Sequence, residues 1–312
     1  MTTNRLVIGT RGSRLALIQT RMVKSLLEKH NPHLTVEEKI IKTRGDIILD
    51  TSLAKIGEKG LFTKEIEEAL FRKEIDLAVH SMKDLPTELP PGLDIGAILE
   101  REDPRDAFVS FKYQRFADLP QSAIVATSSL RRQANALRHR PDLQLVDIRG
   151  NVDTRLRKLE ENGYDGMFLA VAGLKRMGFE DKITEILDPD LMLPAIAQGA
   201  VGVEIRENDI KTRTTLRPLH HPATHAAVIA ERAFLRELEG GCQVPIGALA
   251  RIENDKIILN GNVSAMDGQT YFQGQITGKL PDAEQPGIQL ARNLMKQGAQ
   301  KILDQIYREK RA

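Results

Sequence analysis

The sequence predicts an α/β protein with two similar halves and a smaller third block, on the evidence of three patterns. Strand-like and helix-like segments alternate twice with short connections, which is typical of βαβ units around a mostly parallel sheet. Threonine, serine and arginine stand at the strand-to-helix junctions of both alternating blocks. After Gly247, short strand-like runs separated by turn dipeptides predict a small antiparallel sheet.

The elements of the first block are predicted from the spacing of its apolar residues. A helix is expected from Ser13 to His30 because Leu15, Ile18, Met22 and Leu26 recur at intervals of three and four. The other expected elements are strands from Arg5 to Thr10, Val36 to Thr43 and Ile75 to His80, and a helix from Lys59 to Lys73. Turn-forming residues then end the block, and a polar crossover follows: Pro86, Pro90, Pro91, Gly92 and the run Glu100 to Asp106.

The second block repeats this plan. Its expected elements are strands at Ile124 to Ala126, Leu143 to Ile148 and Gly166 to Val171, with helices at Leu130 to Arg140 and Val152 to Asn162. The run Gly9 to Ala16 in the first block corresponds to Ala126 to Ala134 in the second. Two copies of one α/β module are the inference that follows.

The third block begins with an expected helix from His225 to Leu238. Asn254-Asp255 and Asp267-Gly268 are hairpin signals between the last strand-like runs. These runs are Ala248 to Ile252, Lys256 to Ser264 and Gln269 to Thr277, and a closing helix is expected from Gly287 to Arg308.

Cys242 is the only cysteine, and it stands in a loop-like run between Gly240-Gly241 and Pro245. It has no second cysteine with which to form an internal disulfide, and with seven histidines in the chain a zinc site is not indicated. Glycines and proline favour a thiol presented on a turn. Three readings stay open: a covalent attachment point, a nucleophile, or a small buried apolar residue.

Composition excludes several classes. With 41% hydrophobic and 28% charged residues, the 312-residue chain has the composition of an ordinary globular protein of two or three domains. The net charge of +2 and the lack of tryptophan argue against a nucleic-acid-binding protein. No apolar leader and no membrane-length stretch are evident, so we expect a cytoplasmic protein without membrane association.

The basic residues at the junctions predict an anion site. A strand that ends at a helix N-terminus exposes backbone N–H groups and the positive end of the helix dipole. Ligands of open α/β sheets bind at this edge, so the basic residues should converge in one cleft, although solvated surface charge is the alternative for each one alone. The candidates are Arg11, Ser13, Thr127, Ser129, Arg131, Arg132, Arg149, Arg155 and Arg176.

One acid, Asp84, directly follows the expected strand Ile75 to His80 and precedes Pro86. A carboxylate among arginines can stabilise a developing cation and move protons. The alternative is an aspartate that caps the turn before Pro86.

The order of motifs resembles that of the porphobilinogen deaminase family, whose members are also called hydroxymethylbilane synthases. The resemblance covers roughly residues 5 to 247, whereas the stretch after Ala250 is generic. The motifs are Thr43-Arg44-Gly45-Asp46, Lys59-Gly60-Leu61-Phe62, His80-Ser81-Met82-Lys83-Asp84, Arg101-Glu102-Asp103-Pro104-Arg105-Asp106, Thr127-Ser128-Ser129-Leu130-Arg131-Arg132, Arg149-Gly150-Asn151-Val152, Leu169-Ala170-Val171-Ala172-Gly173-Leu174, Gln198-Gly199-Ala200 and Glu239-Gly240-Gly241-Cys242.

The resemblance implies a fold: two hinged domains like those of type II periplasmic binding proteins, plus a small α+β C-terminal domain with a three-stranded antiparallel sheet. The strand near Gln198 to Glu204 would then return to the first domain. The implied domains are residues 1–99 with 200–217, residues 105–193, and residues 222–312, the last carrying the cysteine loop.

The resemblance also implies an activity and a cofactor. Four porphobilinogen molecules would be joined head to tail onto a dipyrromethane bound through Cys242, with loss of ammonia each time, and released by water as hydroxymethylbilane for heme biosynthesis. Asp84 would stabilise the azafulvene cation, and arginines would bind the acetate and propionate groups. The implied cofactor residues are Cys242, Lys83, Ser81, Asp84, Thr127, Ser129, Arg131, Arg132 and Gly173, and the implied substrate residues are Arg11, Ser13, Arg149, Arg155, Arg176, Lys55, Lys59 and Gln198.

Two other functions compete with this one. A binding protein that senses anions without catalysis would use the same two-lobed cleft, and a thiol hydrolase would pair Cys242 with His220, His221 or His225. The expected partner is small-molecule porphobilinogen alone, with no metal and no nucleic acid, and the expected state is a monomer.

Overall fold

The computed structural model describes residues 4–47, 61–239 and 244–311. The chain divides into two compact units. The first contains the described residues up to Glu102 together with Ala200–His225, and the second contains Asp103–Gly199 and the described residues from Ala226 onward. The predicted division into three domains stays a prediction.

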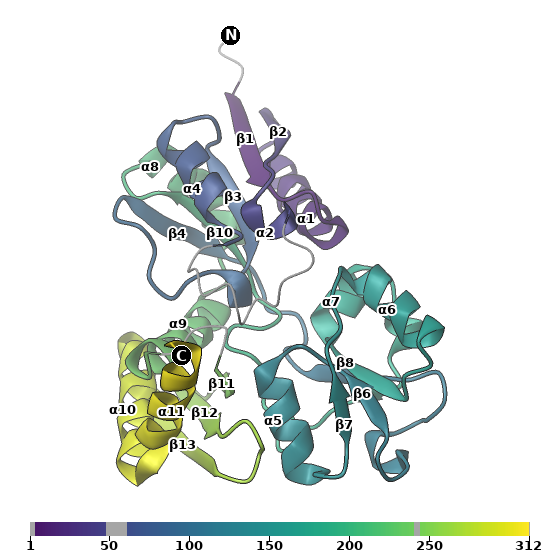
Figure 1. Cartoon of the computed structure of the whole chain (residues 1–312). Helices are drawn as coiled ribbons and strands as arrows, with labels where there is room; N and C mark the ends of the chain where they lie inside the picture. The colour runs from purple at the N-terminus through teal and green to yellow at the C-terminus, as the bar shows by residue number, and fades with distance from the viewer. Residues whose placement is uncertain (1–3, 48–60, 240–243, 312) are drawn as a thin grey trace. The chain divides into compact units, whose positions relative to one another are not determined.

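The first unit is built on a five-stranded mixed sheet (Figure 1). Its strands, in spatial order, are β2 (Leu34–Ile40), β1 (Asn4–Thr10), β3 (Leu77–Ser81), β10 (Val201–Arg206) and β4 (Leu93–Ile98). β1 is parallel to both β2 and β3, whereas β10 is antiparallel to β3 and β4. The expectation that the strand near Gln198 to Glu204 returns to the first sheet is therefore confirmed.

Helices cover both faces of this sheet because its buried residues alternate. Leu6 and Ile8 pack with α1 (Arg14–His30) and α8 (Ile210–Leu216) on one face. Val7 and Ala78 face α4 (Lys64–Phe71) on the other. A short helix, α2 (Arg44–Ile47), follows β2.

The second unit contains another five-stranded mixed sheet of the same plan. Its order is β7 (Gln144–Val146), β6 (Ile124–Ala126), β8 (Gly166–Ala170), β5 (Asp106–Val109) and β9 (Glu185–Ile186). β6 is parallel to β7 and β8, and β5 is antiparallel to β8. One face packs against α6 (Val152–Glu161) and α7 (Val171–Arg176), and the other against α5 (Leu130–His139).

The second unit also contains a three-stranded antiparallel sheet. It consists of β11 (Ile246–Glu253), β12 (Lys256–Ser264) and β13 (Tyr271–Lys279). Asn254 and Asp255 both have positive φ, of 49° and 58°, as a two-residue hairpin turn requires. With α9 (Pro222–Glu237) and α10 (Glu284–Leu294), this sheet confirms the predicted fold class.

Several boundaries differ from those expected. The predicted closing helix is two helices, α10 and α11 (Gln300–Arg311), because Gly298 has a φ of 123° in the π-helical segment Met295–Ala299 between them. The alternation of strand-like and helix-like segments in the sequence did not predict β4, a partly buried strand that follows the proline-rich turn. The helix expected from Lys59 begins at Lys64 in the described part of the chain.

Candidate active site

The parallel strands of the first unit bring four candidate residues to one pocket. β1 and β3 end at the same edge, so Arg11 and Ser13 after β1 lie near Ser81 and Asp84 after β3. The space between the lining residues is about 450 Å³, part of it open to solvent. The lining residues are Arg11, Ser13, Leu15, Ala16, Gln19, Phe62, Thr63, Val79, His80, Ser81 and Asp84.

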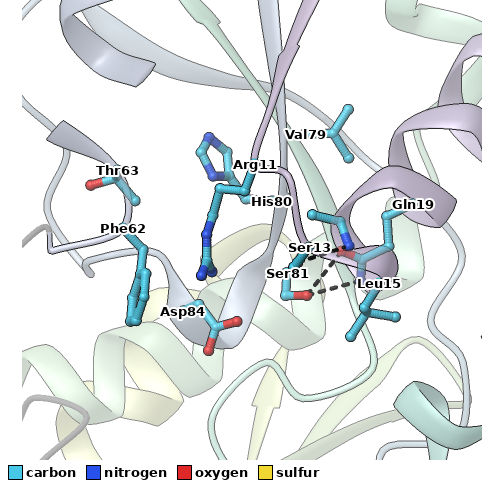
Figure 2. Close-up of a pocket in the computed structure, with 11 residues that line it drawn as sticks. Arg11, Ser13, Leu15, Gln19, Phe62, Thr63, Val79, His80, Ser81 and Asp84 are labelled. Atoms are coloured by element: carbon cyan, nitrogen blue, oxygen red, sulfur yellow. Dashed lines mark hydrogen bonds between the residues drawn. The ribbon is translucent and has the colours of Figure 1, made fainter. Parts of the chain in front are cut away.

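Local structure fixes how these side chains lie. Ser13 caps α1, with its Oγ accepting a hydrogen bond from the Ala16 N–H at 3.4 Å. Gln19 Nε2 donates to Ser81 Oγ at 2.8 Å. The Arg11 guanidinium carbon lies 4.0 Å from the centre of the Phe62 ring, a cation–π contact that holds the charge over an apolar face. Figure 2 shows Arg11, Phe62 and Asp84 grouped at one side of the pocket and Gln19 with Ser81 at the other.

Asp84 is exposed and lies in the 3₁₀ turn Met82–Asp84. Its carboxylate accepts no hydrogen bond within the described residues, so the turn-capping alternative lacks the bond it requires. Lys83 is in the same turn and is partly buried.

A buried polar layer lies behind the pocket. His80 Nε2 is 2.8 Å from Glu204 Oε2, and both side chains are almost wholly inaccessible to solvent. On α4, burial raises the pKa of the Glu67 carboxyl, and the nearby charge of Glu204 raises it further. His80 is thereby held as part of the pocket wall, a role that its position in the sequence did not indicate.

In the second unit the corresponding edge carries the other candidates. β7, β6 and β8 are parallel neighbours, so the segments that follow them start from one edge of the sheet. Thr127 Oγ1 accepts from the Ser129 N–H at 3.2 Å, and Ser129 makes no capping bond to α5. Gly173 lies in the first turns of α7.

Three half-buried arginines surround this edge. Arg149 and Arg155 lie on either side of the Gly150 turn, where Arg155 Nε donates to the Gly150 carbonyl at 2.8 Å. Gly150 has a φ of 115°, a conformation that disfavours other residues. Arg176, at the end of α7, donates from Nη2 to the Gly199 carbonyl at 2.7 Å.

Arg131 and Arg132 are buried, with exposures of 5% and 7%, around a fully buried Asp106. Arg131 Nη1 donates to Asp106 Oδ2 at 2.7 Å and to the Leu193 carbonyl at 2.7 Å. Arg132 donates to Asp106 Oδ1 from Nε at 3.1 Å and from Nη2 at 2.7 Å. The sequence argument placed both arginines at the edge but missed their partner.

Gln198 completes this cluster. It is 1% exposed, and its Nε2 donates to Asp106 Oδ1 at 3.0 Å and to the Pro104 carbonyl at 2.8 Å. Burial raises the pKa of the Asp106 carboxyl, but the charges of Arg131 and Arg132 and hydrogen bonds from Arg131 and Gln198 outweigh burial and hold that pKa far below its usual range.

A signal for Asp106 existed in the sequence. It is the one charged residue at the start of an apolar run, Ala107-Phe108-Val109, that forms the buried strand β5. A buried carboxylate needs cationic partners, and the paired arginines of α5 supply them.

The cluster keeps unused binding capacity. Two guanidinium groups face one carboxylate, and within the described residues Nε and Nη2 of Arg131 have no acceptor. A carboxylate-bearing group fits both the net positive charge and these free donors.

Three candidates, Cys242, Lys55 and Lys59, lie outside the described residues. The described residues contain no group of three or more His, Cys, Asp or Glu placed to bind a metal ion. Nor does any described helix have the length and apolar character needed to span a membrane.

The fold and the two edges define a class: an α/β protein that gathers basic and hydroxyl side chains at the ends of parallel strands. A family model described as the dipyromethane cofactor binding domain of porphobilinogen deaminase matches residues 6–214, and one for the C-terminal domain of the same enzyme matches residues 225–296. The chain belongs to the porphobilinogen deaminase family.

Known relatives match over nearly the whole chain. Porphobilinogen deaminase of Carboxydothermus hydrogenoformans is 53% identical over 303 residues, covering 97% of each chain. That of Geobacter sulfurreducens is 54% identical over 307 residues, covering 98% of this chain and 96% of the relative. A solved structure, a putative methionine-binding lipoprotein of Bacillus subtilis, aligns with a TM-score of 0.44 at 12% identity, over 71% of this chain and 92% of its own.

Proposed function

We propose that this protein is a hydroxymethylbilane synthase that joins four porphobilinogen molecules head to tail and releases the linear product for tetrapyrrole biosynthesis. The observation that carries this proposal is the family match across residues 6–214 and 225–296. It is a transferase reaction with loss of ammonia at each addition. Cytoplasmic location and a monomeric state stay predictions.

The dipyrromethane cofactor is proposed to be attached through the Cys242 thiol and to supply the free pyrrole carbon to which the first substrate is joined. Attachment makes every addition local rather than bimolecular. The proposed binding residues for its carboxylates are Arg131 and Arg132, supported by the spare donors and net positive charge around Asp106, together with Ser81, Lys83, Thr127, Ser129 and Gly173.

Asp84 is the proposed catalytic residue. Loss of ammonia from porphobilinogen leaves a cation, and an exposed carboxylate at the pocket edge can stabilise that cation through the pyrrole N–H and hold or return a proton. Among the described residues, no buried arginine forms an ion pair with this carboxylate, in contrast with Asp106. The support for this role is position, because Asp84 lines the same pocket as Arg11 and Ser13.

The remaining candidate residues, most of them basic, are proposed to bind the substrate. Each pyrrole carries acetate and propionate groups, so the growing chain accumulates negative charge, which guanidinium groups bind in bidentate fashion. The proposed substrate residues are Arg11, Ser13, Arg149, Arg155, Arg176, Lys55, Lys59 and Gln198. That the two edges face one cleft also stays a prediction.

Intact-protein mass spectrometry tests the proposal. The purified protein should carry a dipyrromethane adduct, and porphobilinogen should add a ladder of pyrrole units to it. Cys242→Ser should fold but remain unmodified and inactive, because a hydroxyl is a poor substitute for a thiolate at neutral pH. An unmodified wild-type thiol would instead support the anion-sensing or thiol-hydrolase alternatives.

A further inference from the structure

Glu231, on α9, joins two backbone segments that are distant in sequence. It is 0% exposed, and its Oε2 accepts a hydrogen bond from the Ala197 N–H at 2.6 Å. Its Oε1 accepts from the Ala250 N–H at 2.8 Å. Hydrogen bonds to a buried charge are strong, and loss of the acceptor leaves buried N–H groups unpaired.

The Ala197 side of this link borders the arginine cluster. Ala197 has a φ of 57°, in the left-handed region that is sterically unfavourable for a non-glycine residue. The next residue, Gln198, donates to Asp106, and four residues earlier the Leu193 carbonyl accepts from Arg131. The strained turn at Ala197, which Glu231 stabilises, therefore positions two groups that contact the buried ion pairs: the Gln198 amide and the Leu193 carbonyl.

The Ala250 side of the link lies in the strand that follows the cysteine loop in the sequence. Ala250 lies in β11, which begins four residues after Cys242. β11 also touches the same segment directly, because the Ala248 N–H donates to the Pro194 carbonyl at 3.0 Å. Gly247 approaches Leu193 so closely that a Cβ there would lie 2.8 Å from the Leu193 carbonyl oxygen.

We propose that Glu231 is a positioning residue for cofactor attachment. By holding Ala197 in the left-handed conformation and accepting from Ala250, it fixes β11, the strand that follows Cys242 in the sequence, relative to Arg131, Arg132 and Asp106. This inference rests on the proposed function, because it takes Cys242 as the attachment point and the arginines as the carboxylate site.

The test follows cofactor loading in full-length protein prepared without the cofactor. Porphobilinogen is added, and the appearance of the dipyrromethane adduct is timed by intact mass. Glu231→Gln retains the shape but offers one acceptor to two N–H groups, so loading should slow by at least about tenfold. Glu253→Gln is the matched control, since it makes the same change to an exposed carboxylate at the end of β11 and should load at the wild-type rate.

Rescue separates positioning from a general loss of stability. Glycine adopts the left-handed conformation without steric cost, so adding Ala197→Gly to Glu231→Gln should recover about fivefold in loading rate. Ala197→Gly alone should load normally. If Glu231→Gln does not fold, Glu231→Asp, which withdraws the oxygens by one methylene group, is compared with and without Ala197→Gly in the same way.

The outcomes are distinct. Wild-type protein that never acquires an adduct contradicts the proposed function itself. Wild-type protein that loads, together with a Glu231→Gln variant that loads equally fast, overturns the positioning role. A slow variant that Ala197→Gly does not improve also overturns it, because the defect would then not pass through the left-handed turn.

Discussion

The two α/β sheets share a strand order but present their charged residues in opposite ways. At the first sheet, Arg11 is half buried on the Phe62 ring and Asp84 is exposed. At the second, Arg131 and Arg132 are buried and bound to Asp106. One topology thus supplies both an accessible pocket and a rigid buried cluster.

The difference is physical and suits two kinds of ligand. A charge buried without a partner is strongly unfavourable, so the second edge carries its own counter-charge and keeps its arginines in one geometry whether or not a ligand is present. Such a preorganised site suits a permanently bound group. The more exposed first edge suits substrates that enter and leave.

The largest expected effect is on Asp84. Asp84→Asn keeps the size of the side chain but removes its negative charge, so we expect the first addition to slow by at least about a thousandfold. Single-turnover kinetics on cofactor-loaded protein measures it, and the adduct itself should remain. Asp84→Glu, with its charge displaced by one methylene group, should be slow yet measurable; an Asn variant that reacts at the wild-type rate would remove Asp84 from the chemistry.

Asp106→Asn should act on stability instead. It leaves two buried guanidinium groups without a carboxylate, which we expect to lower the free energy of unfolding by about 3–5 kcal/mol. Urea unfolding monitored by circular dichroism measures this change. An equal loss from Asp165→Asn, whose carboxylate pairs with exposed Lys112, would contradict the special role of the buried cluster.

The contribution of Asp106 to the free energy of unfolding should depend on pH in a defined direction. Because the pKa of Asp106 is lowered in the folded protein, its contribution to stability is fully present above the unfolded-state value of about 4 and is lost as pH falls below it. The stability difference between wild type and Asp106→Asn should therefore be constant from about pH 5 to pH 8 and shrink in more acidic solution. A difference that grows on acidification would reverse the assigned sign.

Substitutions of the arginines at the two sheet edges should have different effects on cofactor assembly and elongation. Arg131→Leu or Arg132→Leu should impair cofactor assembly, whereas Arg11→Leu should leave the adduct intact and slow elongation by about tenfold to a hundredfold, the range for a lost charged hydrogen bond. We expect the result for Arg11→Leu also from Arg149→Leu and Arg155→Leu. Mass spectrometry distinguishes missing adduct from stalled intermediates, and normal elongation in all five variants would make these arginines surface charges.

The smallest expected effect compares the two helix starts. Ser13→Ala removes the capping bond to Ala16 and should cost about 1 kcal/mol of unfolding free energy. Ser129→Ala removes no capping bond, so its effect on stability should be smaller. Thermal unfolding of both variants is the measurement, and a reversed order would mean that Ser129, not Ser13, stabilises its helix.

Much of the fold was predictable because it depends on local periodicity. The helix Arg14–His30 and the strand Ile124–Ala126 matched their predictions within a residue, since apolar spacing and capping residues act over short distances. The predicted closing helix was interrupted at Gly298, where φ is positive and where a Cβ would lie 3.0 Å from the Phe272 ring, a contact with a distant segment that apolar spacing does not reveal.

By itself, the sequence determined the class of fold, the repeated junctions and the candidate residues, because strand alternation and the ends of parallel strands follow from local pattern. Only the tertiary structure decided which arginines are buried, since Asp106 is 25 residues from Arg131 and meets it through the return of β5 into the sheet. It alone placed Glu231 between Ala197 and Ala250. Burial and pairing of charge depend on contacts between distant segments, and no local spacing encodes them.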